Sequence, residues 1–119
     1  MDEIDLIFDR LSHSKFRSSF KLKSRELEYL NQKGIDLVMD HALEFIENRI
    51  VPAYPANDGK QTPYGKHPVF VAQHATATCC RSCIQKWHKF EKGKELQSDQ
   101  KLYILEVIKM WLELQLENN

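Results

Sequence analysis

Apolar residues recur every three or four positions through most of this chain, which is the spacing of one face of an α-helix. In the first twelve residues this face is formed by Ile4, Ile7, Phe8 and Leu11. The same spacing predicts further helices over about residues 24–33, 36–51, 78–88 and 98–116. We therefore predict an all-α fold, in which residues 1–119 form a single compact domain of five or six short helices with one long functional loop.

Capping and helix-breaking residues define the ends of these predicted helices. Ser24 can cap the second helix, and Gly34 can end it because glycine readily takes the left-handed conformation. Pro52 stops the next helix, since proline cannot continue the hydrogen-bond ladder. Residues 69–71 are open to two interpretations, because their β-branched side chains favour a strand whereas Pro68 and the helical context favour a helix. We predict a helix there.

Residues 51–66 form a long loop that contains three of the four prolines. Loops of this length without periodicity are uncommon in small domains and are often functional. Asn57 and Asp58 begin a tight turn, and Lys60 follows it with side-chain donors. The alternative is a surface loop that wraps the core and is anchored by its two tyrosines.

Charge is balanced overall but unevenly distributed. With 17 basic and 17 acidic residues the net charge is zero, yet residues 13–25 and 59–94 are both predominantly basic. Such blocks favour an anionic partner, either nucleic acid or a phosphorylated small molecule. Within residues 12–21, Phe16 and Phe20 alternate with basic residues, as in segments that bind single-stranded nucleic acid. The same residues could instead be a linker whose rings insert into the core.

The candidate chemistry lies in residues 67–88, which hold all three cysteines and three of the five histidines. Cys80 and Cys83, followed by His88, have the spacing of half a zinc site, and His74 can supply the fourth ligand. Cys79 and His67 are alternatives for that fourth position. We therefore consider zinc as a cofactor, held by the side chains of His74, Cys80, Cys83 and His88.

Two other interpretations of the same cysteines remain open. Cys80 and Cys83, together with Ile84 and Trp87, could be the apolar stripe of an ordinary helix, because buried cysteine behaves as a small apolar residue. A cysteine could also act as a nucleophile assisted by a nearby histidine. That arrangement depends on proximity in space, which sequence does not supply.

A second candidate site needs no metal. The start of the helix that carries Arg81 would leave backbone N–H groups free to bind a phosphate or carboxylate. His67 lies just before this region, and the donor-rich loop could fold over it. The predicted anion contacts are Asn57, Asp58, Lys60, His67 and Arg81.

The run from His67 to His88, HPVFVAQHATATCCRSCIQKWH, and the preceding NDGKQTP resemble the hallmark of a family of short bacterial proteins catalogued only as a domain of unknown function. The resemblance extends over most of the chain and implies no activity. Family members lack export signals, which implies a cytoplasmic protein. The odd number of cysteines and the acidic start of the chain also favour that compartment.

Composition narrows the function classes. The chain is 42% hydrophobic and 29% charged, as in a folded globular protein, and no apolar run approaches the length of a membrane span. We predict a binding module for an anionic ligand, supported by zinc. The alternatives are a small enzyme that depends on a cysteine or histidine, such as a hydrolase, and a structural or protein-interaction domain with inert core cysteines.

Overall fold

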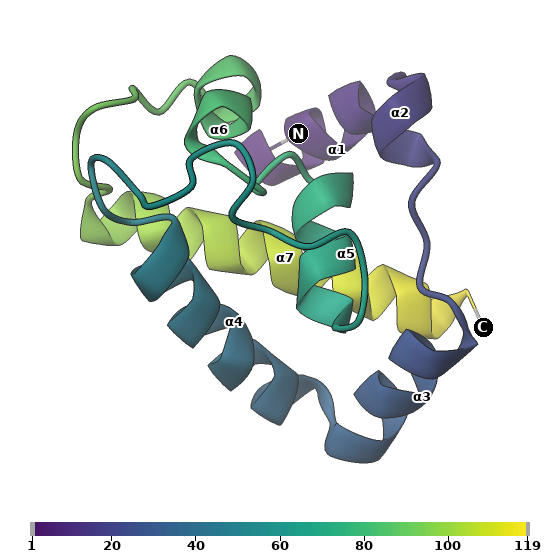
Figure 1. Cartoon of the computed structure of the whole chain (residues 1–119). Coiled ribbons are helices and arrows are strands. Elements are labelled where there is room, and N and C mark those ends of the chain that lie inside the picture. Colours follow the sequence, from purple (N-terminus) through teal and green to yellow (C-terminus); the bar gives the residue numbers. More distant parts are fainter. Residues whose placement is uncertain (1, 119) are drawn as a thin grey trace.

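The computed structural model describes residues 2–118, and Figure 1 shows their helices and connections. This part of the chain contains no strand, so the prediction of an all-α fold is confirmed. Its helices are α1 (Glu3–Ser12), α2 (Lys15–Ser18), α3 (Ser24–Lys33), α4 (Ile35–Arg49), α5 (Pro68–Ala75), α6 (Arg81–His88) and α7 (Ser98–Glu117). The helix that the apolar pattern missed is α2, a single turn capped by the side chain of Ser14, which accepts a hydrogen bond from Arg17 N.

The long helix α7 runs through the middle of the fold, and α4 and α5 pack against it (Figure 1). Ile104, Ile108 and Leu112 recur every fourth residue along α7 and are fully buried. They join α4 and α5 in one core, because each of these helices also presents an apolar face. Burying one such side chain stabilises the fold by about 1.5–3 kcal/mol, so this larger cluster contributes more hydrophobic stabilisation than the smaller one around α1.

A smaller cluster holds the N-terminal helix in place. Ile4, Ile7 and Leu11 of α1 are buried together with Ala77 and with Val107 of α7. These α1 positions are three and four residues apart, as the apolar pattern predicts. Packing against Ala77 brings α1 next to the connection between α5 and α6, where the cysteines lie.

Gly34 and His67 lie at the ends of helices and fix where these helices begin or end. Gly34 is the single residue between α3 and α4 and has φ +86°, a conformation that side chains disfavour. His67 caps α5, because its Nδ1 accepts a hydrogen bond of 3.1 Å from Val69 N. Pro68 is the first residue of α5. The predicted helix over this segment is therefore confirmed, and the alternative strand does not form.

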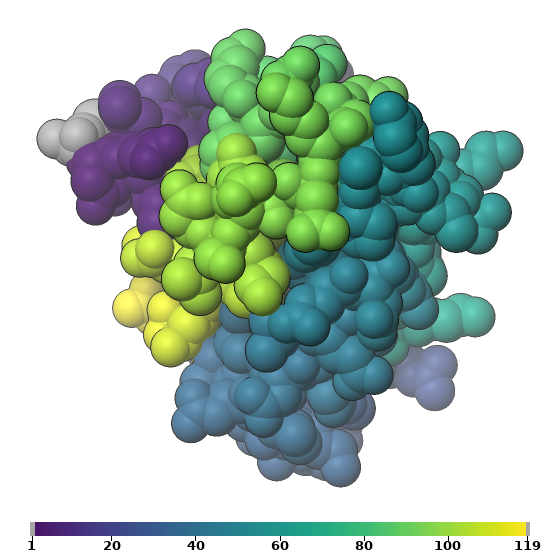
Figure 2. All heavy atoms as spheres, turned by 90° about the vertical axis from the view of Figure 1, so that its left-hand side faces the viewer, coloured from purple at the N-terminus to yellow at the C-terminus, as the bar shows by residue number. Residues whose placement is uncertain are grey.

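The connection from α6 to α7 lies against the end of α4. Leu96 N donates a hydrogen bond of 3.0 Å to Val51 O, which ties the two connecting segments together. Figure 2 shows this face, with the light green segment before α7 next to the teal part of the chain that follows α4. None of the described helices combines the length and apolar character required to cross a membrane.

Candidate metal centre

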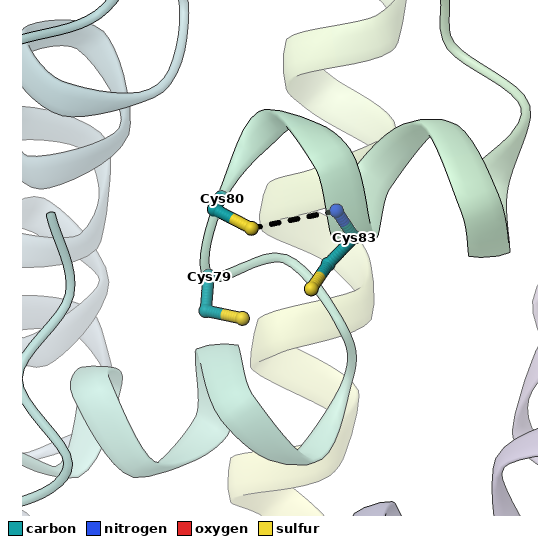
Figure 3. Close-up of side chains that lie close together, drawn as sticks. All are labelled: Cys79, Cys80 and Cys83. Carbon is teal, nitrogen blue, oxygen red and sulfur yellow. Dashed lines mark hydrogen bonds between the residues drawn. The ribbon is translucent and has the colours of Figure 1, made fainter. Parts of the chain in front are cut away.

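The three cysteines of the chain converge on one point (Figure 3). Cys79 and Cys80 lie in the connection before α6, and Cys83 lies in the first turn of that helix. Their Sγ atoms are all within 4.8 Å of one another, and all three are free thiols. Cys80 is also the N-cap of α6, because its Sγ accepts a hydrogen bond of 3.4 Å from Cys83 N. The local geometry of a helix start therefore brings Cys80 and Cys83 together.

A tight turn after α5 directs Cys79 toward the other two thiols. Ala77 has φ +60°, and Thr78 N donates a hydrogen bond of 2.8 Å back to Gln73 O. The side chain of Gln73 in turn donates to Thr78 O at 3.1 Å. Thr62 Oγ1 donates to Cys79 O at 2.7 Å, so the long loop fixes the backbone on the other side. Because these groups are buried, water does not compete with the hydrogen bonds that hold the turn.

Arg17 of α2 reaches the thiols from a distant part of the sequence. Its Nη2 donates to Cys83 Sγ at 3.1 Å, and its Nη1 lies 3.8 Å from Cys79 Sγ. The same Nη1 donates to His74 O at 2.7 Å, which anchors the guanidinium. Arg17 is only 8% exposed, and a buried cation requires negative or polar partners. Sequence reasoning placed Arg17 in a basic segment but did not connect it with the cysteines.

The three thiols differ in acidity because they share hydrogen bonds. Hydrogen bonds from Cys79 and Cys80, followed by that from Arg17, lower the pKa of Cys83. Hydrogen bonds within the cluster, together with burial, raise the pKa of Cys79. The cluster therefore holds one negative charge readily and resists a second and a third. A bound cation would favour those further ionisations, because metal ligation requires thiolates.

The thiols form part of the wall of a cavity of about 610 Å³. Its charged lining residues are Arg17 and Lys60, and within residues 2–118 no carboxylate side chain lines it. Phe16 and Tyr64 also line it. The full lining is Phe16, Arg17, Gly59, Lys60, Thr62, Pro63, Tyr64, His74, Cys79, Cys80 and Cys83. Cys79 and Cys80 are buried and Cys83 is half-buried, yet all three line a pocket whose other charged residues are basic.

His74 lines this cavity but is not part of the group of converging ligand atoms. Its Nε2 lies 3.1 Å from Thr62 O and 3.2 Å from Pro63 O, so it carries the hydrogen and donates to these carbonyls. Burial lowers the pKa of His74, which favours the neutral ring. The ring stacks on Tyr64 with centroids 4.0 Å apart. His74 thus shapes the pocket wall, and its Nε2 is engaged by the backbone.

His88, the other histidine of the predicted zinc set, lies away from the thiols. It is buried, with Nε2 2.8 Å from Thr76 O and Nδ1 3.1 Å from Tyr103 Oη. The helix continues without interruption from Cys83 to His88, and five helical residues place the two side chains on different faces. The structure therefore groups Cys80 and Cys83 with Cys79, which the sequence suggested only as an alternative fourth ligand.

Arg81, predicted as an anion contact, is 1% exposed and bonded to the backbone of the chain itself. Its Nη1 donates to the carbonyl oxygens of residues 50, 51 and 52 at 3.2, 3.4 and 2.7 Å. Its Nη2 donates to those of residues 91 and 94 at 3.0 and 2.7 Å. Arg81 therefore joins the start of α6 to two connecting segments, and it does not line the cavity.

The other predicted anion contacts are divided among different places. Asp58 occupies the start of α6, where its Oδ1 accepts from Arg81 N at 3.4 Å, so the chain's own carboxylate lies where an external anion was expected. Asn57 forms the turn, with φ +58°. His67 is half-buried and does not line the cavity, and its Nε2 lies 3.1 Å from His41 Nδ1. Of the five predicted contacts, Lys60 lines the cavity and the other four do not.

Comparison with known proteins gives a family and no activity. No solved structure matches the chain. A family model described as a domain of unknown function, DUF4186, matches residues 5–113 of the 119 residues. This match covers all the residues of the thiol cluster and its cavity. The chain therefore belongs to the DUF4186 family of uncharacterised domains.

Proposed function

We propose that this protein is a metal-binding module in which Cys79, Cys80 and Cys83 hold a thiophilic divalent ion, with zinc as the first candidate. The remaining coordination position of the ion faces the cavity and takes an anionic ligand. The single observation that carries this proposal is the convergence of three free thiols within 4.8 Å on the wall of an open pocket.

The spacing of the sulfur atoms suits a metal ion. With zinc–sulfur bonds of about 2.3 Å, a tetrahedral site has neighbouring sulfurs about 3.8 Å apart. The Sγ atoms, all within 4.8 Å of one another, therefore need only a small contraction to reach this arrangement. Soft thiolates select zinc and copper over magnesium or calcium, because those harder ions prefer oxygen ligands.

The number of protein ligands supports an open coordination position. In the described part of the chain the group of converging ligand atoms contains no histidine or carboxylate besides the three sulfurs. The Nε2 atom of His74 and both ring nitrogens of His88 have hydrogen-bond partners of their own. Zinc sites with three protein ligands usually keep a fourth position for water or a ligand, whereas structural sites have four.

The charge of the complex supports a divalent ion. Three thiolates and one divalent cation carry a net charge of −1, and the guanidinium of Arg17 lies against two of the sulfurs. Arg17 would then balance the complex in its buried setting. A trivalent ion on three thiolates would be neutral and would leave the charge of Arg17 without a counterion.

Metal content and cobalt absorption test this proposal. We expect the purified full chain to contain about one zinc per molecule, and Co²⁺ exchanged into it should give thiolate charge-transfer bands. Cys83→Ser should abolish the bands. Ser82→Ala, an exposed neighbour on the same helix, should leave them unchanged.

A chain that remains metal-free after reduction and zinc addition would contradict the proposal. If one thiol of that metal-free chain reacted much faster than the others, the cysteine-dependent enzyme would become the better interpretation. Three slowly reacting thiols would instead favour cysteines that only pack.

A further inference from the structure

Two exposed aromatic side chains line the same cavity as the thiols. Tyr64 is 69% exposed and Phe16 is 52% exposed, although both line the cavity. One face of the Tyr64 ring stacks on His74, with an interplanar angle of 9°. Ligand pockets are commonly lined by aromatic side chains, and an exposed ring on a concave surface can stack on a ligand.

Tyr64 is held in place before any ligand arrives. His74 Nε2 bonds to the carbonyls of Thr62 and Pro63, the two residues directly before Tyr64. The same imidazole supports the tyrosine ring, so one side chain fixes both the loop backbone and the ring. A ring fixed in this way loses little conformational entropy when a second ring stacks on it.

Lys60, a charged residue of the cavity wall, is free to bind a ligand. Lys60 is exposed, lines the cavity and takes part in none of the ion pairs formed by residues 2–118. The other cation of the lining, Arg17, is already bonded to the thiols and to His74 O. Lys60 is therefore the side chain that can meet an acidic group entering from solvent.

We infer that the ligand of this pocket is a planar aromatic anion, whose ring stacks on Tyr64 while its acidic group meets Lys60 and the bound metal ion. The inference rests on the proposed function, because it uses the same pocket and the open coordination position. The cavity of about 610 Å³ is large enough for either of two sources, an aromatic carboxylate or a nucleoside phosphate.

A matched pair of probes tests the class. Benzoate and cyclohexanecarboxylate carry the same charge and have similar size, but only benzoate is planar and aromatic. In calorimetric titrations of the zinc-loaded chain we expect benzoate to bind about tenfold more tightly, because aromatic stacking contributes this order of affinity. Equal affinities, or tighter binding of cyclohexanecarboxylate, would overturn the inference.

Further probes identify the source. If adenosine monophosphate binds more tightly than benzoate, adenosine and inorganic phosphate, the ligand is a nucleotide. Benzoate that binds more tightly than the nucleotide would identify an aromatic carboxylate. Both results support a planar aromatic anion. If phosphate binds as tightly as the nucleotide and the two carboxylates bind equally, the inference of a planar aromatic anion is overturned.

Variants of the loop tyrosines separate this inference from the metal proposal. Tyr64→Leu should lose about tenfold in benzoate affinity, and Tyr64→Phe should retain it. Tyr54→Leu is the matched control, because Tyr54 is 84% exposed in the same loop and does not line the cavity. All three variants should keep the cobalt spectrum. An unchanged benzoate affinity in Tyr64→Leu would refute the role of the ring.

The two proposals can fail independently. If the chain binds no metal, the proposed function fails, and the same titrations on the metal-free chain decide the ligand class. A preference for benzoate that Tyr64→Leu abolishes would support the aromatic anion even then, and no preference would overturn it. If cobalt binds and the two carboxylates do not differ, the metal proposal stands and the aromatic inference is wrong.

Discussion

Replacing Arg81 with methionine should destabilise the fold more than any other single charge removal that the structure suggests. The guanidinium is almost fully buried and donates to five backbone carbonyls, at 2.7 to 3.4 Å, from residues 50–52 and from residues 91 and 94. These carbonyls belong to the connecting segments before α5 and after α6, which the bond from Leu96 N to Val51 O also joins. Arg81 adds five hydrogen bonds that connect both segments with the start of α6.

The magnitude follows from those bonds. A hydrogen bond to a charged group contributes about 1.5–3 kcal/mol, but the five do not add, because some carbonyls would regain water after the substitution. Arg81 Nε is buried without a partner, so methionine also relieves one unfavourable burial. We expect Arg81→Met to lower the free energy of unfolding by about 3–5 kcal/mol.

The assay is urea unfolding followed by the fluorescence of Trp87 and Trp111. Arg81→Lys keeps the charge but cannot span both segments, so it should cost about 2–3 kcal/mol and remain folded if the methionine variant does not. Arg10→Met is the control, since Arg10 is exposed and makes one backbone hydrogen bond, to Trp87 O at 3.0 Å. It should cost less than about 1 kcal/mol. A loss within about 1 kcal/mol for Arg81→Met would refute this account of the site.

Three further predictions concern residues that shape the site or the helices leading to it. His67 keeps its ring neutral down to a pKa of about 4, because of burial and of the neighbouring His41, whereas the unfolded ring takes up its proton at about 6.5. The unfolded chain thus binds more protons between these values, so stability should fall as the pH drops from 6.5 to 4. His67→Asn should reduce this loss by about 1–3 kcal/mol in urea titrations across the window, and an unchanged pH dependence would contradict it. Thr62→Val should cost about 1–2 kcal/mol in urea unfolding, because it removes the buried bond to Cys79 O, and a neutral effect would show that the bond is dispensable. Gly34→Ala should cost about 1–3 kcal/mol from its positive φ alone, since no atom lies within 4 Å of the added Cβ, whereas Gly65→Ala should stay within about 0.5 kcal/mol in the same unfolding assay. Equal losses for the two glycines would remove the backbone explanation.

The sequence by itself determined most of the helices, although it missed the single turn of α2. Apolar spacing placed α1, α3, α4, α6 and α7, because a helix that packs on a core must present one apolar face regardless of what it packs against. Gly34 could be recognised as a helix end for an equally local reason, its freedom to take a positive φ. The pairing of Cys80 with Cys83 was also local, since three residues along the first turn of a helix bring two side chains together.

Only the tertiary structure decided what surrounds those cysteines. Arg17 lies 66 residues before Cys83, and its contact with the thiols depends on how α2 packs against α5. The partners of Arg81 could not be predicted from the sequence either, because an arginine near a helix start can bind an external anion or internal carbonyls. Arg81 binds carbonyls because residues 50–52 and 91–94 fold next to its guanidinium. Local patterns specify which groups are available. Packing between segments that are distant in the sequence decides which of these groups come into contact, and those contacts form the site.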